Sequence, residues 1–536
     1  MARGTGDCRA AGSGARPLRP VAPRAASRRG RLVAAGQQPA TVLDHVTNVS
    51  DFIWGGTWAG QEVLPFPPMV IVLLGIGLYF MVGLRFMPIL KLGSAFAGLF
   101  AGRKGSGAGE ISPFAALSTA LSGQVGTGNL AGVATAIALG GPGAVFWMWI
   151  TALIGMALAF AEGSLAIRYR EKTSDGVYRG GPMSYIIIGL GPKWTWLAIL
   201  FCIGTLFSAL VTGNSIQANA VADGLNELFG IEDWIGGLIV AVAVFAVIIG
   251  GIKSIGSTAE KVVPVMAAAY IVMAVIAILL DIQDIPETFA RIFHGAFNPQ
   301  SATGGFLGAA MIMAIRAGVA RGLFSNEAGQ GSTPIAHAVA QTDDPAQQGR
   351  MAMMGTFIDT IVICTMTALV ILTVEGNFTG GGTAVEHAWQ SDLTGFAMTS
   401  GAFAAAFPLA IGTIPLGTLI ASIALILFVF TTLLTWSYYG ERAITFLYDR
   451  IPGSTRRGEK VLHIAWRLIW CLVIFVGSFQ DLELVWRLGD ISNATMALPN
   501  LIALALLSGV VFKLAKGERK AGADHTKETP EEPVEY

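Results

Sequence analysis

The stretch LSGQVGTGNLAGVATAIALGGPGAVFWMW, Leu121–Trp149, has the apolar residues of a membrane-spanning helix around a polar, glycine-rich centre. That centre runs from Gly123 to Asn129, and glycine is among the least favourable residues in a helix interior. Backbone left unpaired in hydrocarbon is costly, so a break there is tolerated only where it lines a cavity enclosed by protein. If the span enters the membrane near Pro113, its midplane comes about ten residues later, at Gly123 and Gln124. We therefore expect an interrupted helix at the centre of the membrane.

A second reading of the same glycines is close packing between helices, as in motifs of small residues at four-residue spacing. Close packing accounts well for Gly132, Ala136 and Gly140. It accounts poorly for the polar positions between the glycines, which are Gln124, Thr127 and Asn129. The cavity reading is therefore favoured, and it predicts exposed amide and carbonyl groups at the half-helix ends, ready to bind a carboxylate and a cation.

The composition predicts an all-α polytopic membrane protein. Of the 536 residues, 53% are hydrophobic and 13% are charged, whereas soluble proteins carry about 25% charged residues. The four cysteines lie far apart, at positions 8, 202, 364 and 471, and the six histidines are scattered. This spacing matches neither a disulfide framework nor a metal motif, so it argues against a metalloenzyme, and we expect no cofactor.

Membrane spans follow from apolar length, because a bilayer core of about 30 Å needs about 20 apolar residues. Eleven segments meet this test, and Val42–Trp58 before them is predicted to be an interfacial helix. The eleven expected spans are Phe66–Leu84, Pro113–Leu139, Ala144–Ile167, Trp194–Thr212, Ile235–Ile252, Val262–Leu280, Gly305–Phe324, Met351–Val374, Leu416–Tyr439, His463–Gly477 and Ile491–Val511.

Charged residues between the spans predict the orientation. Lys and Arg gather after the first, third and ninth spans and in the tail, whereas the loops after the fourth and eighth spans hold Asp and Glu without Lys or Arg. The basic side of a membrane protein is cytoplasmic, so we expect the N-terminus outside and the C-terminus in the cytoplasm. Residues 41–516 would form the transporter domain and 517–536 a charged cytoplasmic tail.

Residues 1–40 violate this rule, since their eight arginines and single acid would lie outside. Three readings remain for them: a cleaved transit-like segment, a disordered extension, or an upstream start codon wrongly chosen. The third is preferred.

A second interruption is expected in the seventh span, GGFLGAAMIMAIRAGVARGLFSNEAGQGSTPIAHA from Gly304. Counting about ten residues inward places Ile315–Gly318 at the midplane, where Arg316 and Gly318 interrupt the apolar run. Five spans separate this segment from the first interrupted one. Because five is odd, two five-span units would be inverted relative to each other, with Phe66–Leu84 as an extra leading helix.

Several polar residues inside the spans are functional candidates. Asp359 lies within the eighth span, and Arg316 is its expected charge partner; a structural pair and a proton or cation role are equally favoured. Glu162 and Asp490 are expected to tie helices together. In the ninth span, Thr431, Thr432 and Thr435 offer hydroxyls, although such hydroxyls often bond back to their own helix. Trp436 follows Thr432 by one turn on the same face.

At these residues the chain resembles the alanine or glycine:cation symporter family. The resemblance is carried by GTGN followed closely by GGPGAVFWMW, then by GVARGLFSNEAGQGSTPIAHA, FIDTIVICTMTALVIL and TWSYYGERAI, and it spans roughly residues 42–516. It implies a 5+5 inverted repeat similar to the sodium-coupled leucine transporter, plus one leading helix. It also implies prokaryotic uptake of alanine or glycine with sodium, sometimes with protons.

The resemblance suggests roles for single residues. Backbone amides of Val125-Gly126-Thr127-Gly128-Asn129 would bind the amino-acid carboxylate. The sodium ion would be held by Val125, Asn129, Thr431 and Thr432. Gln124, at a position where many family members have arginine, is expected to bind the substrate as well. From the pattern alone, Val125, Phe324 and Trp436 are expected to line a pocket that accepts only a hydrogen or a methyl side chain.

The sequence therefore predicts sodium-coupled symport of alanine or glycine by alternating access in a prokaryotic plasma membrane. Sodium is the expected co-substrate, and the lipid bilayer, but no nucleic acid, is an expected partner. A proton-coupled transporter of another small zwitterion and a cation channel are the alternatives. A membrane enzyme is disfavoured because no clustered acids, histidines or nucleophile stand out. The preference for D- or L-alanine, the stoichiometry and the oligomeric state stay open.

Overall fold

The fold is known from a computed structural model, which describes residues 41–64, 66–173, 176–297, 307–480 and 482–517. The chain divides into two units, Met1–Val42 and Leu43–Tyr536, and the second unit contains all of the expected spans. The predictions for residues 1–40, and for the tail beyond residue 517, lie outside the described residues.

The described residues form helices and four short antiparallel hairpins. The α-helices are α1 (Val42–Gly55), α2 (Pro68–Gly83), α3 (Met87–Leu90), α4 (Leu92–Ala101), α5 (Pro113–Gln124), α6 (Val133–Gly140), α7 (Gly143–Arg168), α8 (Pro182–Ser184), α9 (Thr195–Leu210), α10 (Ile216–Phe229), α11 (Asp233–Ile248), α12 (Gly251–Leu280), α13 (Ile285–Phe297), α14 (Leu307–Asn326), α15 (Thr333–His337), α16 (Pro345–Thr356), α17 (Thr365–Thr373), α18 (Gly395–Ala406), α19 (Leu416–Tyr448), α20 (Arg456–Gly477) and α21 (Leu482–Ala515).

Shorter elements connect or interrupt these helices. The π-helical turns are η1 (Gly128–Gly132), η2 (Tyr185–Gly189), η4 (Val211–Ser215) and η6 (Phe357–Cys364), and the 3₁₀ turns are η3 (Pro192–Trp194), η5 (Ile282–Asp284) and η7 (Ala388–Gln390). The hairpins pair β1 (Thr57–Trp58) with β2 (Gln61–Glu62), β3 (Glu171–Lys172) with β4 (Tyr178–Arg179), β5 (Glu375–Gly380) with β6 (Thr383–His387), and β7 (Ala410–Ile411) with β8 (Ile414–Pro415).

Helix occupies most of every expected span, as far as the structure describes it. Seven helices of the described residues are long and apolar enough to cross a membrane. Three shorter apolar helices, Pro68–Gly83, Gly128–Gly140 and Asp233–Ile248, fall below that length. The chain is thus a multi-pass helical membrane protein, while the count of eleven spans and the inverted repeat stay predictions.

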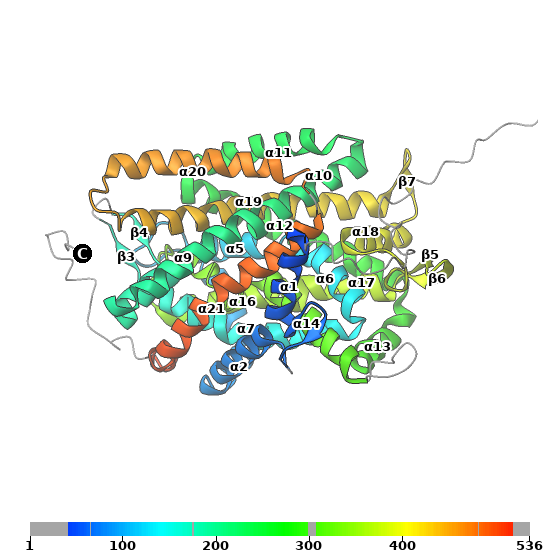
Figure 1. The fold of residues 1–536 in the computed structure, drawn as a ribbon, viewed down its shortest axis with the longest axis horizontal. Coiled ribbons are helices and arrows are strands. Elements are labelled where there is room, and N and C mark those ends of the chain that lie inside the picture. Colours follow the sequence, from blue (N-terminus) through cyan, green and yellow to red (C-terminus); the bar gives the residue numbers. More distant parts are fainter. Residues whose placement is uncertain (1–40, 65, 174–175, 298–306, 481, 518–536) are drawn as a thin grey trace, which may run out of the picture. The chain divides into compact units, whose positions relative to one another are not determined.

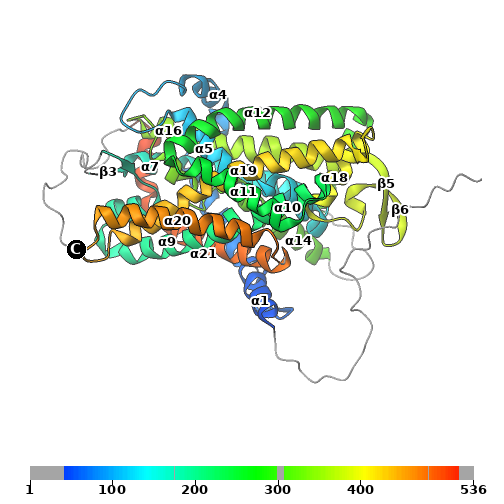
Figure 2. The same ribbon diagram turned by 90° about the horizontal axis from the view of Figure 1, so that it is seen from above.

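Helix α5 lies at the centre of the helical packing. Its start is well defined, because Pro113 occupies the first turn and the hydroxyl of Ser112 accepts a hydrogen bond from the amide of Ala115 over 3.0 Å. It packs against α12, α19, α15 and α16, and every residue from Ala115 to Gln124 is buried. Figures 1 and 2 show α12 and α19 running along the long axis beside it.

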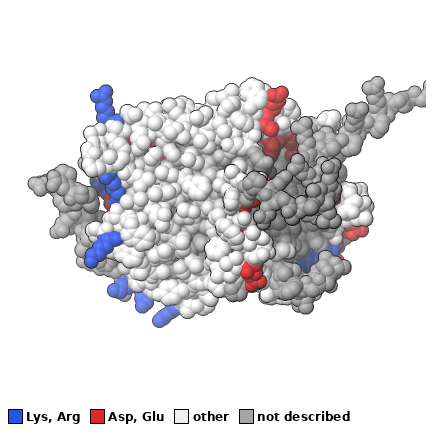
Figure 3. Space-filling view, viewed as in Figure 1, with Lys and Arg blue, Asp and Glu red and all other residues white. Residues whose placement is uncertain are grey.

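Charge is separated along this axis. Figure 3 shows Lys and Arg mainly at the end that carries β3 and β4, and most Asp and Glu toward the end that carries β5 and β6. Helix α13, which Figure 1 shows near β5 and β6, carries Arg291, and Arg291 forms an ion pair with Glu287 over 2.7 Å. The separation agrees with the charge pattern read from the sequence.

The predicted position of the second interruption is wrong. Helix α14 continues through Ile315–Gly318 and ends only at Asn326. Gly318 instead allows α14 to pack closely against α7, because a Cβ atom there would lie 2.4 Å from the carbonyl oxygen of Ala144 in α7. The chain leaves the helix at Glu327, whose φ of 56° is left-handed, and Gly329 and Gly331 follow with φ of 83° and 89°.

Candidate functional site

The first interruption lies where the glycine-rich stretch predicts it. Helix α5 ends at Gln124, and Val125 has extended backbone angles, with φ of −78° and ψ of 98°. The chain resumes with the π-helical turn η1 at Gly128 and continues into α6. Val125, Thr127 and Asn129 are all completely buried, so the break lies inside the protein.

Side chains satisfy the backbone amides of this break. The amide of Gly126 donates to Oδ1 of Asn129 over 2.9 Å, and the amide of Thr127 donates to Oε1 of Gln217 over 3.2 Å. Gln217 lies at the start of α10, directly after the π-helical turn η4. Both acceptors are oxygen atoms, so the amides point where an oxygen ligand can bind.

The two glycines of the break are held closely by neighbouring atoms. A Cβ atom on Gly126 would lie 2.6 Å from Oγ1 of Thr432. A Cβ atom on Gly128 would lie 3.0 Å from Cδ1 of Phe324 and 3.1 Å from Cα of Ser325. By contrast, a Cβ atom on Gly132 would meet only the carbonyl oxygen of Thr127, at 3.9 Å. Close approach therefore requires glycine at the first two positions and not at the third.

The second interruption touches the first. Nε2 of Gln124, at the end of α5, donates to the carbonyl of Asn326, at the end of α14, over 2.5 Å. Glu327 follows directly, and its carboxylate accepts from Nε1 of Trp436 over 2.9 Å and from the hydroxyl of Ser332 over 2.5 Å. The ends of two separate helices thus meet in one buried cluster.

Helix α19 presents one polar face to the first break. The hydroxyl of Thr432 lies 3.0 Å from the carbonyl oxygen of Val125, and Nε1 of Trp436 lies 3.3 Å from the carbonyl oxygen of Gly123. Both threonine hydroxyls bond back to the carbonyl of Phe428, at 3.0 Å for Thr432 and 2.9 Å for Thr431. The second neighbour of the Thr431 hydroxyl is Met266 of α12. The structure therefore brings Thr432 to the break, but not Thr431.

Asp359 lies beside the break with uncharged partners. Its carboxylate accepts hydrogen bonds of 2.7 Å from Nδ2 of Asn129, from the hydroxyl of Ser325 and from the hydroxyl of Thr360. The predicted pairing with Arg316 is wrong, because the guanidinium of Arg316 reaches Asp51 of α1, 3.7 Å away. Arg316 lies more than two turns before Ser325 along α14, so its side chain meets a different neighbour.

The two expected helix ties are confirmed. Glu162 of α7 accepts from Nδ2 of Asn500 in α21 over 2.7 Å, and Asp490 of α21 pairs with Arg321 of α14 over 3.0 Å. Both contacts are buried, so each joins two helices within the core.

Phe324 and Trp436 lie at two sides of the break. The Phe324 ring contacts Trp486 of α21 with ring centroids 4.9 Å apart, and it faces Gly128. Trp436 packs against η4, where a Cβ atom on Gly213 would lie 2.4 Å from its ring. Both rings are buried next to the interrupted segment, and their role as pocket lining stays a prediction.

Sequence reasoning missed three residues of the cluster. Ser325 and Glu327 lie within the quoted seventh-span stretch, but no role is predicted for them from the sequence. Gln217 lies in VTGNSIQAN, a polar run directly after an apolar segment, which is the one signal that could have drawn attention to it. Its partner Thr127 is 90 residues away, so no local pattern connects them.

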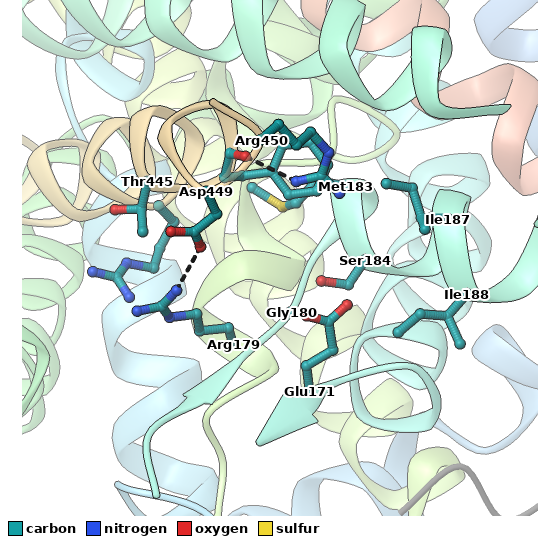
Figure 4. A pocket seen from close by; sticks show the side chains of 12 residues that line it. Glu171, Arg179, Gly180, Met183, Ser184, Ile187, Ile188, Thr445, Asp449 and Arg450 are labelled. Atoms are coloured by element: carbon teal, nitrogen blue, oxygen red, sulfur yellow. Dashed lines mark hydrogen bonds and ion pairs between the residues drawn. The ribbon is translucent and has the colours of Figure 1, made fainter. Parts of the chain in front are cut away.

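A cavity of about 210 Å³ at the basic end of the molecule is a different kind of feature. Figure 4 shows Arg179 of β4 directed at Asp449, and the two form an ion pair of 2.9 Å. Burial raises the pKa of Glu171 and of Asp449, although nearby arginines oppose this. None of the predicted site residues lines this cavity, and its ion pair ties the β3–β4 hairpin to the end of α19.

Most of the chain is similar to proteins of one family. A model of the sodium:alanine symporter family matches residues 53–531. The sodium/alanine symporter AgcS of Methanococcus maripaludis is 42% identical over 474 residues, which cover 88% of this chain and 96% of that protein. The probable sodium/glutamine symporter GlnT of Bacillus subtilis is 36% identical over 487 residues, covering 90% and 93%.

Among solved structures, MhsT in complex with L-phenylalanine is similar to this chain with a TM-score of 0.46 and 13% sequence identity. The match covers 77% of this chain and 100% of that one. The family assignment therefore rests on the sequence matches.

Proposed function

The chain belongs to the sodium:alanine symporter family, and on this premise we propose that it carries alanine and glycine into the cell together with sodium by alternating access. The contact between the two interrupted helices carries the proposal. Gln124 joins the end of α5 to the end of α14, so a ligand bound at either break changes the surroundings of the other. Coupled movement of two solutes needs the binding of one to change the affinity for the other.

The amides of Gly126 and Thr127 are the proposed ligands of the amino-acid carboxylate. They now donate to side-chain oxygens of Asn129 and Gln217, and both side chains can rotate away. A carboxylate offers two oxygens and a full negative charge, so its hydrogen bonds to amides are stronger than those of a neutral side chain. The substrate would thus replace weaker acceptors with a stronger one.

Two positions are proposed for the coupling cation. The carbonyl of Val125 and the hydroxyl of Thr432 are hard oxygen ligands 3.0 Å apart, close enough to share one sodium ion. Asp359 supplies a carboxylate with uncharged partners in the described structure. A buried charge without a counter-charge is costly, so a cation next to Asp359 would stabilise it. Asn129 lies between the two positions, bonded to both Gly126 and Asp359.

Selectivity would follow from the crowding of the break. Gly126 and Gly128 lie against Thr432 and Phe324, so a substrate with a hydrogen or methyl side chain is favoured over one with leucine or phenylalanine. GlnT, one of the similar proteins, is described as a probable sodium/glutamine symporter, so glutamine is included among the competitors to be tested.

The alternative of proton coupling also uses Asp359, since a buried carboxylate is able to bind a proton in place of sodium. Uptake of labelled alanine into vesicles that hold the purified protein distinguishes the two. An imposed sodium gradient should drive accumulation, whereas a pH gradient alone should not. A steady current without amino acid would favour a channel.

The proposed setting is a prokaryotic plasma membrane, with the basic end in the cytoplasm and eleven spans arranged as two inverted units after α2.

A further inference from the structure

A second cavity, of about 210 Å³, lies between α1, α14 and α21. A water molecule takes about 30 Å³ in the liquid, so the cavity has room for a solute of several non-hydrogen atoms. Five charged residues contribute to its lining: Asp51, Arg316, Arg321, Arg487 and Asp490. Three arginines face two aspartates, which leaves a formal charge of 3 − 2 = +1 and favours an anion.

The ion pairs of the cavity do not use all of its donors. Arg487 and Arg316 share the single carboxylate of Asp51, at 3.1 Å and 3.7 Å. Arg321 pairs with Asp490 through Nη2 over 3.0 Å.

Arg321 is the residue that most needs a further acceptor. Its side chain is 9% exposed, and its buried Nη1 atom has no hydrogen-bond partner. A buried donor without an acceptor costs free energy, more so when it belongs to a charged group. A guanidinium presents its N–H groups as a planar fork that matches a carboxylate.

A chain of side-chain contacts connects the cavity lining to the first interrupted helix. The guanidinium carbon of Arg321 lies 4.9 Å from the centre of the Trp486 ring, and that ring packs on Phe324 with centroids 4.9 Å apart. Phe324 in turn lies against Gly128. Only the Phe324–Trp486 pair therefore lies between Arg321 and the break in this contact chain.

We propose that this cavity is a second, outer binding site for the carboxylate of the transported amino acid, with Arg321 as its donor. The substrate occupies it before passing Phe324 and Trp486 on the way to the break. This inference rests on the proposed function. A site that concentrates the substrate next to a closed barrier lowers the substrate concentration at which transport is half-maximal.

The test is the KM for alanine uptake in vesicles with the protein in one orientation. Arg321→Gln should raise the KM by about tenfold or more, the usual loss for a hydrogen bond to a charged group. The KM of Arg321→Lys should lie between those of the wild type and Arg321→Gln, since lysine keeps the charge but lacks the planar fork of N–H groups. Arg291→Gln is the matched control, because it removes an outer arginine that pairs with Glu287 away from this cavity. Alaninamide, which has no carboxylate, should compete weakly with alanine in the wild type.

Two further variants separate a binding site from a structural tie. Asp490→Asn removes the charged partner of the Arg321 guanidinium. If Arg321 binds substrate, the KM should be unchanged or lower. If the pair is purely structural, the KM should rise as much as in Arg321→Gln. Ala320→Leu fills the cavity without removing a charge and should raise the KM. These two variants decide the matter even if Arg321→Gln fails to reach the membrane.

The two proposals fail in different ways. Wild-type protein without sodium-dependent alanine uptake would overturn the proposed function and this inference with it. Normal wild-type uptake, together with a wild-type KM in both Arg321→Gln and Ala320→Leu, would overturn the outer site alone.

Discussion

The side-chain amide of Gln124 donates to the main-chain carbonyl of Asn326 over 2.5 Å, which joins the two points where buried helices are interrupted. The residues are 202 positions apart, and both are buried. Broken helices expose backbone groups that must find partners in an apolar surrounding. In this protein the first break supplies a donor to the carbonyl at the second. The backbone groups of the first break find partners in Asn129, Gln217 and Thr432.

The first prediction concerns Gly128. Gly128→Ala should abolish alanine accumulation, because an added Cβ meets Phe324 and Ser325 and overpacking costs about 1–3 kcal/mol. Gly132→Ala is the matched control, since nothing lies closer than 3.9 Å to the added atom. Uptake is measured at equal protein levels in the membrane. Equal activity of the two variants would mean that the break is a packing feature.

The second prediction concerns the cation. Thr432→Ala should raise the sodium concentration for half-maximal uptake by about two- to tenfold, the range expected for one lost oxygen ligand of modest strength. Thr431→Ala should leave this sodium concentration unchanged, because the Thr431 hydroxyl lies near Met266 of α12 where that of Thr432 reaches Val125. Sodium-activation curves at a fixed alanine concentration provide the measurement. A larger effect at Thr431 would place the sodium site elsewhere.

The third prediction concerns buried carboxylates. Asp359→Asn keeps the shape and removes the charge, so alanine uptake should lose its dependence on sodium while the protein stays folded. Glu162→Gln provides the comparison, since Glu162 is equally buried and binds Asn500 of α21. We expect it to lower thermal stability and to keep the sodium dependence. The reverse result, sodium dependence lost only in Glu162→Gln, would exclude Asp359 as the coupling group.

The fourth prediction concerns Trp436. Trp436→Ala should let glutamine and leucine compete with alanine, because it opens space beside Gly123 and Gly213. Loss of a buried aromatic side chain costs about 3–5 kcal/mol, so a lower melting temperature is expected as well. Trp436→Phe keeps a smaller aromatic ring at this position and loses the N–H group bonded to Glu327, and it should stay more selective than Trp436→Ala. Unchanged competition profiles in both variants would remove Trp436 from the pocket.

The first interruption could be predicted from the sequence because its signal is local. Glycines alternate with Gln124, Thr127 and Asn129 inside an apolar run, and no stable continuous helix suits that pattern. The second interruption lies further along the chain than predicted, because Arg316 and Gly318 look disruptive in isolation. Their neighbours Asp51 and Ala144 explain them, and both lie far away in the chain.

The partners of single side chains were harder to predict than the helices. Opposite charges suggested Arg316 for Asp359, yet the structure surrounds that carboxylate with Asn129, Ser325 and Thr360. The adjacent residues Thr431 and Thr432 also point in different directions, since successive residues of a helix point about 100° apart. Which of the two faces the break depends on how α19 is rotated against α5, and that is set by packing across the whole core.

Uptake of labelled alanine by the purified protein in sealed vesicles tests the central claim most directly. With an inward sodium gradient, the wild type should accumulate alanine above its external concentration, and Gly128→Ala should not. Replacing sodium with choline, or imposing only a pH gradient, should abolish the accumulation. Accumulation that ignores sodium, or that persists in Gly128→Ala, would contradict sodium-coupled transport through the interrupted helices.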